Sequence, residues 1–198
     1  MLYHKTFFDF RFKHPDQVTL PIHFNYYTPA NEQKLLVSLI GGTRGNVLEI
    51  GCNEGHTTRN FALSFPNKKV YAVDYSGSNE VMCGEQAKEN LPPEKIGHLA
   101  KEIPNVIVVD IDSRTFDYKD KNIGFVFVDG DHSYNGVKSD TENALKGINS
   151  NGVIAWHDFL EENAKETWVG VRKYLTELSE NMDIYHIEGT HVCYAIIR

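Results

Sequence analysis

Residues 47–58 read VLEIGCNEGHTT and join an apolar run to a loop that carries two glycines, Gly51 and Gly55. The apolar residues before Gly51 are typical of a buried strand. Glycine lets the backbone turn where a side chain would be strained. The stretch therefore predicts a strand that turns directly into a helix. Such a corner either only packs the helix against the strand or holds a ligand on its backbone.

Around this corner, apolar runs and helical patterns alternate along the chain. Runs rich in β-branched residues recur at 46–51, 68–74, 105–111, 123–131 and 151–159, and helical patterns lie at 28–40, 56–65, 79–91, 134–148 and 166–179. This alternation predicts βαβ units and a mainly parallel sheet with both faces buried. Residues 183–198 read instead as two strands joined by a short turn at 188–190. We predict an α/β, doubly wound sheet of seven strands, with an antiparallel last strand at or near the edge.

Length and composition narrow the class of protein. At 198 residues the chain is long enough for one domain with a sizeable core. We predict a single domain at 28–198, preceded by an aromatic-rich segment at 1–27. The formal net charge of −7 argues against nucleic acid as a partner, and no apolar run reaches the ~20 residues of a membrane span. The three cysteines fit no metal spacing and cannot all pair, which favours a reducing, cytoplasmic location.

A carboxylate closes the second apolar run, at Asp74, 25 residues after Glu49. In a parallel sheet it would lie beside the glycine corner, where it could accept both hydroxyls of a ribose. Nicotinamide dinucleotides use the same acid, so Asp74 alone does not select the ligand. Asn53 stands where the dinucleotide fingerprint needs its middle glycine. This position argues against a dinucleotide.

Four segments together resemble a known family: VLEIGCNEGHTT at 47–58, VYAVDYS at 70–76, FVFVDGDHSYNGVKSDTENAL at 125–145 and NSNGVIAWHDF at 149–159. They are similar to class I S-adenosylmethionine-dependent methyltransferases. The nearest branch is that of small-molecule O-methyltransferases of the catechol and macrocin types (methyltransferase domain family 24-like). The resemblance covers about residue 30 to the end. It implies a Rossmann-like fold, S-adenosyl-L-methionine as cofactor, and O-methylation of a small hydroxylated molecule such as a sugar or a phenol.

The resemblance also implies a set of cofactor-binding residues. The glycine corner would surround the methionine part, the acid after the second strand would hold the ribose, and the turn after the third strand would read the adenine. The implied residues are Glu49, Gly51, Cys52, Asn53, Gly55, Asp74, Tyr75, Asp112 and Ser113.

Acids and histidines follow the fourth and fifth apolar runs. Asp129, Asp131 and His132 come after one, and His157 and Asp158 after the next. Carboxylates this close repel one another, and a divalent cation would remove the conflict. The resemblance implies that Asp129, His157 and Asp158 hold a metal. The imidazole shifts the preference from magnesium toward manganese, iron or zinc.

Other roles remain open for the same residues. Asp129 and Asp131 could instead cap the following helix, which we favour for Asp131, and His157 could be a neutral residue bonded to backbone. Asp129 and His132 are the candidate catalytic residues, and His132 is the candidate base that would take the proton of an acceptor hydroxyl. His191 has no partner that the sequence reveals and is expected at the surface or in packing.

Two other functions stay open at this stage. The chain could be a non-catalytic subunit that binds the cofactor or a nucleoside, or a cephalosporin-hydroxylase-like protein of the same fold. The small-molecule acceptor is not evident from the sequence. A homo-oligomer could complete the wall of its pocket.

Overall fold

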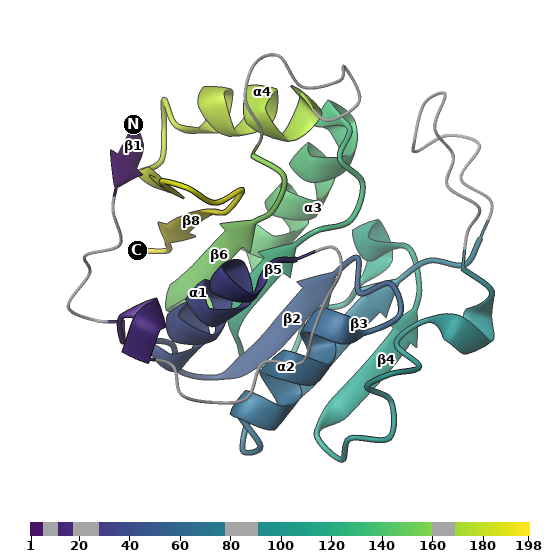
Figure 1. Cartoon of the computed structure of the whole chain (residues 1–198). Coiled ribbons are helices and arrows are strands. Elements are labelled where there is room, and N and C mark those ends of the chain that lie inside the picture. The colour runs from purple at the N-terminus through teal and green to yellow at the C-terminus, as the bar shows by residue number, and fades with distance from the viewer. Residues whose placement is uncertain (6–11, 18–27, 78–90, 160–168) are drawn as a thin grey trace.

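The computed structural model describes residues 1–5, 12–17, 28–77, 91–159 and 169–198 (Figure 1). The strands are β1 (Leu2–Lys5), β2 (Asn46–Ile50), β3 (Val70–Asp74), β4 (Val106–Asp110), β5 (Ile123–Val128), β6 (Ile148–Trp156), β7 (Ile184–Ile187) and β8 (Cys193–Ile196). The helices are α1 (Ala30–Gly41), α2 (His56–Ser64), α3 (Tyr134–Gly147) and α4 (Val169–Leu178), with short 3-10 helices η1 (Pro15–Gln17), η2 (Pro93–Lys95) and η3 (Ser113–Thr115). The helix expected at 79–91 lies almost entirely outside the described residues.

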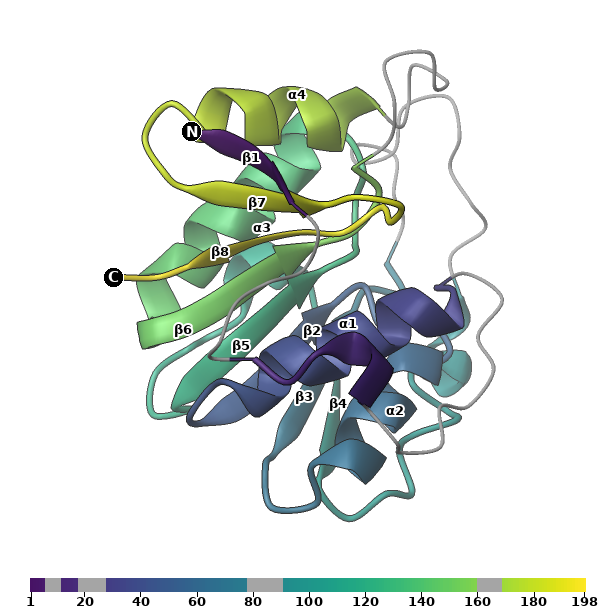
Figure 2. The ribbon, with the colours of Figure 1, turned by 60° about the vertical axis from the view of Figure 1, so that its left-hand side comes forward.

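The strands form one mixed sheet in the order β1-β7-β8-β6-β5-β2-β3-β4. Strands β2 to β6 pair in parallel, and β8 runs antiparallel to both β6 and β7. The expected α/β fold with a reversed last strand is therefore confirmed, but the number of strands was wrong. The sheet has eight strands, because β1 pairs in parallel with β7. The reversed strand β8 lies near one edge, with β7 and β1 outside it (Figure 2).

Helices cover the sheet on both faces. Residues of α1 and α2 share one buried cluster with Val47, Phe125 and Phe127. Residues of α3 and α4 share another with Leu48 and Val126. Neighbouring residues of β2 and β5 thus point to opposite faces, as the period of a strand requires. All six residues of β5 are buried, which is why the sequence there reads as a continuous apolar run.

The parallel pairing fixes where the functional candidates lie. Ile50 is in register with Val128, and Val128 with Trp156. The last residues of β2, β5 and β6 therefore lie side by side. The loops that follow them leave the sheet at one edge, the one formed by the carboxyl ends of the parallel strands. Asp74 and Asp110 end β3 and β4 at the same edge. In the described part of the chain, no helix is long and apolar enough to cross a membrane.

Candidate functional site

The loop after β2 turns through three left-handed residues. Gly51 has φ 88°, Asn53 has φ 49° and Gly55 has φ 93°. Glycine tolerates this region readily, and asparagine is one of the few other residues that does so. At Gly51 the need is also steric, because a Cβ atom there would lie 2.2 Å from the carbonyl oxygen of Asp129. The loop after β2 and the loop after β5 are thus packed backbone to backbone.

Asp74 lies beside this loop and is bonded to it. The backbone N–H of Asn53 donates to Asp74 Oδ2 at 2.6 Å, and that of Tyr75 donates to Oδ1 at 2.8 Å. Burial raises the pKa of the Asp74 carboxyl, although the two N–H groups partly oppose the shift. Each carboxylate oxygen can accept more than one hydrogen bond, so Asp74 can still accept hydroxyl groups.

Helix α2 begins directly after the glycine corner. Its N-cap is Gly55, and no side chain caps it within the described residues. The first N–H groups of a helix lack intrahelical partners and suit an anionic group. Beneath the corner, Glu49 is buried and accepts a hydrogen bond from the hydroxyl of Thr58. Burial raises the pKa of Glu49 well above its ordinary value.

These features fit S-adenosylmethionine. Asp74, a half-buried acid, stands where ribose hydroxyls would bind, an uncapped helix start stands where an amino-acid carboxylate would bind, and the loop between them leaves no room for a side chain at Gly51. Tyr75, which follows Asp74 directly, is 38% exposed. Cys52, within the same loop, is buried, and burial raises the pKa of its thiol strongly.

The residues expected to bind adenine, Asp112 and Ser113, make contacts with protein groups. Asp112 accepts the backbone N–H of Arg114 at 3.0 Å and pairs with its guanidinium, which lowers the pKa of the Asp112 carboxyl. The hydroxyl of Ser113 donates to Asp140. The role expected for Asp112 and Ser113 in adenine binding stays a prediction. The segment that follows β3, at 78–90, lies outside the described residues.

The acids and histidines after β5 and β6 do converge. His132 Nε2 lies 2.9 Å from Asp158 Oδ2 and 3.8 Å from Asp129 Oδ1. His157 Nδ1 lies 3.5 Å from Asp129 Oδ1 and 3.4 Å from Asp158 Oδ2. Asp131 is turned elsewhere, since it accepts the backbone N–H of Ser133 at 2.8 Å.

Asp131 and Ser133 form the start of α3. Ser133 is the N-cap, and its hydroxyl accepts the N–H of Gly136 at 3.0 Å. Asp131 supports that cap through its bonds to Ser133. The capping role preferred for Asp131 is consistent with these contacts, whereas Asp129 makes no such contact with the helix start and faces the histidines.

Charge in this cluster is balanced by proton uptake on the imidazoles. Burial by itself would lower the pKa of His132, but Asp129 and Asp158 raise it to about 9. For His157 too, burial disfavours the charged form of the ring, whereas the nearby carboxylates favour it. The carboxylates outweigh burial, so the pKa of His157 is raised well above 6.5. Conversely, burial would raise the pKa values of Asp129 and Asp158, and the histidines lower both.

The same atoms could hold a metal ion. Donor atoms around an ion with bonds of about 2.0–2.2 Å lie about 3–3.5 Å apart. The contacts of His157 Nδ1 with Asp129 Oδ1 and Asp158 Oδ2 have this spacing. His132 is also near enough to be a ligand with Asp129 and Asp158, because one donor atom from each lies within 4.8 Å of the others. Two carboxylates and an imidazole suit manganese, iron or zinc.

Two contacts at this edge were not anticipated from the sequence. Glu32 of α1 lies 2.9 Å from His157 Nε2, although 125 residues separate them. Ser76 donates its N–H and its hydroxyl to Asp110, at 2.9 and 2.6 Å. No local motif marks either contact, because each joins two elements that only the folded sheet brings together.

Solved structures with a similar fold include methyltransferases, and their sequence identities to this chain are low. Cofactor-bound Rv0187 from MTB is 22% identical with a TM-score of 0.65, over 93% of this chain and 86% of that one. The O-methyltransferase TomG from Streptomyces achromogenes, in complex with SAM, is 18% identical with a TM-score of 0.56, over 86% and 81%. CalS11, a calicheamicin methyltransferase, is 14% identical with a TM-score of 0.64, over 83% and 76%.

At these identities the structural likeness shows the fold alone. No curated protein matches the sequence significantly. The family is shown by a sequence model of the methyltransferase domain, which matches residues 48–159, from the strand before the glycine corner to the residue after Asp158. That match spans more than half of the 198 residues and includes Asp74, Asp129, His132 and His157. The chain belongs to the methyltransferase domain family.

Proposed function

We propose that this chain is an S-adenosylmethionine-dependent O-methyltransferase that acts on a small hydroxylated molecule with the help of a divalent cation. One observation carries the proposal. The glycine corner and the acid–histidine cluster touch: the N–H of Asp129 donates to the carbonyl of Ile50 at 2.9 Å, and Gly51 packs against the Asp129 carbonyl. A cofactor and a cation bound at these two places would be neighbours.

Each residue then has a physical task. When bound, S-adenosylmethionine supplies a methyl group on a sulfonium, and the cation supplies a Lewis acid. Asp74 would accept the ribose hydroxyls, and the N–H groups at the start of α2 would bind the carboxylate. Asp129, His157 and Asp158 would hold the cation and orient the acceptor. Since transfer is an in-line displacement, positioning provides much of the rate.

His132 would take up the proton of the acceptor hydroxyl. While it is paired with Asp158 it is protonated near neutral pH, because that contact helps to raise its pKa to about 9. Asp129 also raises this pKa, so His132 can act as a base only when both carboxylates are paired with another positive charge. A cation held by Asp129 and Asp158 would be such a charge, so the roles of ligand and base are compatible.

The substrate class is supported by the relatives. TomG is an O-methyltransferase, and CalS11 is described as a TDP-rhamnose 3'-O-methyltransferase. An acceptor hydroxyl on a sugar or a phenol fits a site with a candidate base and a candidate cation. Cys52 and Cys193 are buried and free, which suits a reducing cytoplasm.

The test is methyl transfer from labelled S-adenosylmethionine to a panel of sugars and phenols. We expect transfer with Mg²⁺ or Mn²⁺, its loss on chelation, and a loss of about 100-fold or more in Asp129→Asn. Asp117→Asn is the matched control, since Asp117 is an acid bonded to Lys119 in the loop before β5. If transfer persists in the presence of chelator and in Asp129→Asn, the proposed role of the cation is refuted. Cofactor binding without transfer to any acceptor would favour a non-catalytic subunit.

A further inference from the structure

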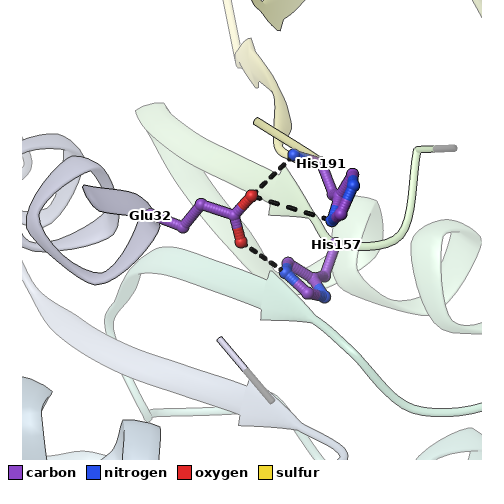
Figure 3. A group of neighbouring side chains, drawn as sticks. All are labelled: Glu32, His157 and His191. Carbon is purple, nitrogen blue, oxygen red and sulfur yellow. Dashed lines mark hydrogen bonds and ion pairs between the residues drawn. The ribbon is translucent and has the colours of Figure 1, made fainter. Parts of the chain in front are cut away.

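A buried glutamate from α1 contacts His157 of the candidate metal cluster, on the side of the ring away from Asp129 and Asp158. Glu32 lies in the first turn of α1 and its side chain is 3% exposed. Figure 3 shows its carboxylate directed at His157 and His191. Glu32 lies outside the family match, which begins at residue 48.

Both oxygens of Glu32 are engaged. Oε2 lies 2.9 Å from His157 Nε2, and Oε1 accepts the backbone N–H of His191 at 2.7 Å (Figure 3). His191 belongs to the turn between β7 and β8, so Glu32 joins α1, the end of β6 and that turn. A buried carboxylate is costly unless it is paired and hydrogen-bonded. These two contacts meet that requirement.

The contact with Glu32 determines which nitrogen of His157 is free for the cluster. If Nε2 donates to Glu32, Nδ1 is the nitrogen that faces Asp129 and Asp158, at 3.5 and 3.4 Å. A carboxylate that accepts the second ring N–H of a histidine ligand fixes its tautomer and its orientation and makes it more basic. The side chain of His157 is 5% exposed, so the ring has little freedom otherwise.

We propose that Glu32 is a positioning residue, which holds the His157 ring so that Nδ1 is presented to a cation shared with Asp129 and Asp158. This inference rests on the proposed function, in which those three residues bind a cation. His191 contributes through its backbone N–H, which holds the other oxygen of Glu32. The side chain of His191 is half exposed and has no part in the role.

A competing arrangement uses the same atoms. Glu32, His157 and His191 each offer a donor atom within 4.8 Å of the others, so an ion could lie among them. His157 would then bind through Nε2 rather than Nδ1. The His191 ring nitrogen is 3.8 Å from Glu32 Oε1, whereas the His191 backbone N–H is at 2.7 Å. The shorter contact favours a hydrogen-bonded Glu32.

Nitrogen NMR of the full chain with labelled histidines distinguishes the two arrangements, in which His157 binds the ion through Nδ1 or through Nε2. The resonances of His157 are assigned by comparison with the spectrum of His157→Gln. On titration with Zn²⁺ we expect the Nδ1 resonance of His157 to move and Nε2 to keep its proton. Deprotonation and coordination at Nε2 would overturn the proposal. In the metal-free protein, the Nε2–H proton should exchange slowly in wild type and rapidly in Glu32→Gln, since glutamine cannot accept from both neighbours. Equal exchange in the two proteins would also overturn it.

Calorimetry with Mn²⁺ gives the second readout. Glu32→Gln should weaken Mn²⁺ binding by about 10–100-fold, while S-adenosylmethionine binding, which serves as the folding check, stays unchanged. Glu32→Asp keeps the charge and should recover part of the affinity. His191→Ala keeps the backbone N–H and should bind Mn²⁺ as wild type does. Weak binding in His191→Ala, or wild-type binding in Glu32→Gln, contradicts the proposal.

Failure of the proposed cation would look different. Wild type would then bind neither Zn²⁺ nor Mn²⁺, and no nitrogen resonance would move. The exchange rate of the Nε2–H proton in wild type and Glu32→Gln would still decide whether Glu32 fixes the ring.

Discussion

His132 Nε2 and Asp158 Oδ2 lie 2.9 Å apart, so the candidate base and one candidate metal ligand are partners of each other. The two residues come from loops after different strands, β5 and β6. Their contact means that a change at Asp158 is felt directly at the base.

The first prediction follows from this contact. His132 has a pKa raised to about 9 by Asp129 and Asp158, against an ordinary value of 6.5. A histidine whose pKa is higher in the folded state than in the unfolded state stabilises the fold. This stabilisation is fully present below pH 6.5 and is lost as pH rises toward 9. Asp158→Asn should lower the pKa of His132 and flatten this part of the stability profile. NMR titration of His132 and unfolding between pH 6 and 9 measure both effects. A His132 pKa that does not change in Asp158→Asn would contradict the contact.

The second prediction concerns the ribose acid. Asp74→Ala should weaken S-adenosylmethionine binding by about 1.5–3 kcal/mol, the cost of losing hydrogen bonds to a charged group. Calorimetry measures it, with Asp117→Ala as a surface control. An unchanged affinity for S-adenosylmethionine in Asp74→Ala would show that Asp74 is not part of the cofactor site. Tight NADH binding by the wild type would overturn S-adenosylmethionine as the cofactor.

A third prediction tests the packing of the two loops. Gly51→Ala places a methyl group 2.2 Å from the Asp129 carbonyl oxygen, at φ 88°. We expect about 2–5 kcal/mol of lost stability, because the left-handed backbone and the overpacking add. Gly189→Ala is the control: its φ is 76°, but nothing lies within 4 Å. It should cost only about 1–2 kcal/mol. Chemical denaturation of both variants provides the comparison, and equal losses would show that the clash relaxes.

Asp140 provides a fourth prediction. Burial raises the pKa of this carboxyl to about 6, against an ordinary 3.8, although the Ser113 hydroxyl opposes the shift. The folded state therefore favours the protonated acid, and stability is lost as pH rises from about 4 to about 6. Asp140→Asn removes this loss and keeps an acceptor for Ser113. It should gain about 1–3 kcal/mol above pH 6 and little at pH 4. A gain that does not depend on pH would refute the assignment.

A fifth prediction concerns the amino-terminal segment. Phe12 is 6% exposed and packs edge-on against Tyr194, with ring centroids 5.9 Å apart. Phe12→Ala should cost about 3–5 kcal/mol in the free energy of unfolding, whereas Leu63→Ala, at an exposed site, should change little. A small effect at Phe12 would mean that the segment only docks. The boundary between 1–27 and 28–198 stays a prediction, because most of 1–27 lies outside the described residues.

The central sheet was predictable because its signals are local. The β-branched runs at β2, β3, β5 and β6 mark strands buried on both faces, and Gly51 and Gly55 mark the turn between β2 and α2. Once these strands are parallel, the meeting of Asp74, Asp129 and His157 at one edge follows from topology. The reversed last strand also followed from the short turn before His191.

The missed features depend on distant partners. Residues 2–5, LYHK, show no clear alternation, and only β7 makes them a strand. Glu32 reads as an ordinary acid in a first helical turn, where the helix dipole favours it. Nothing near residue 32 indicates that His157 is its partner.

The pairing of β1 with β7 also has a consequence for how the chain folds. Leu2 pairs with Ile184, so β1 has no partner strand until β7, 182 residues further along the chain, has been made. At about 5–20 residues per second this interval is about 10–35 seconds. The half of the sheet that carries β1, β7 and β8 must therefore assemble last. Its contacts are far apart in sequence, and such contacts slow folding. Until they form, the outer edge of β6, which ends at Trp156 directly before His157, is open to pairing with another chain.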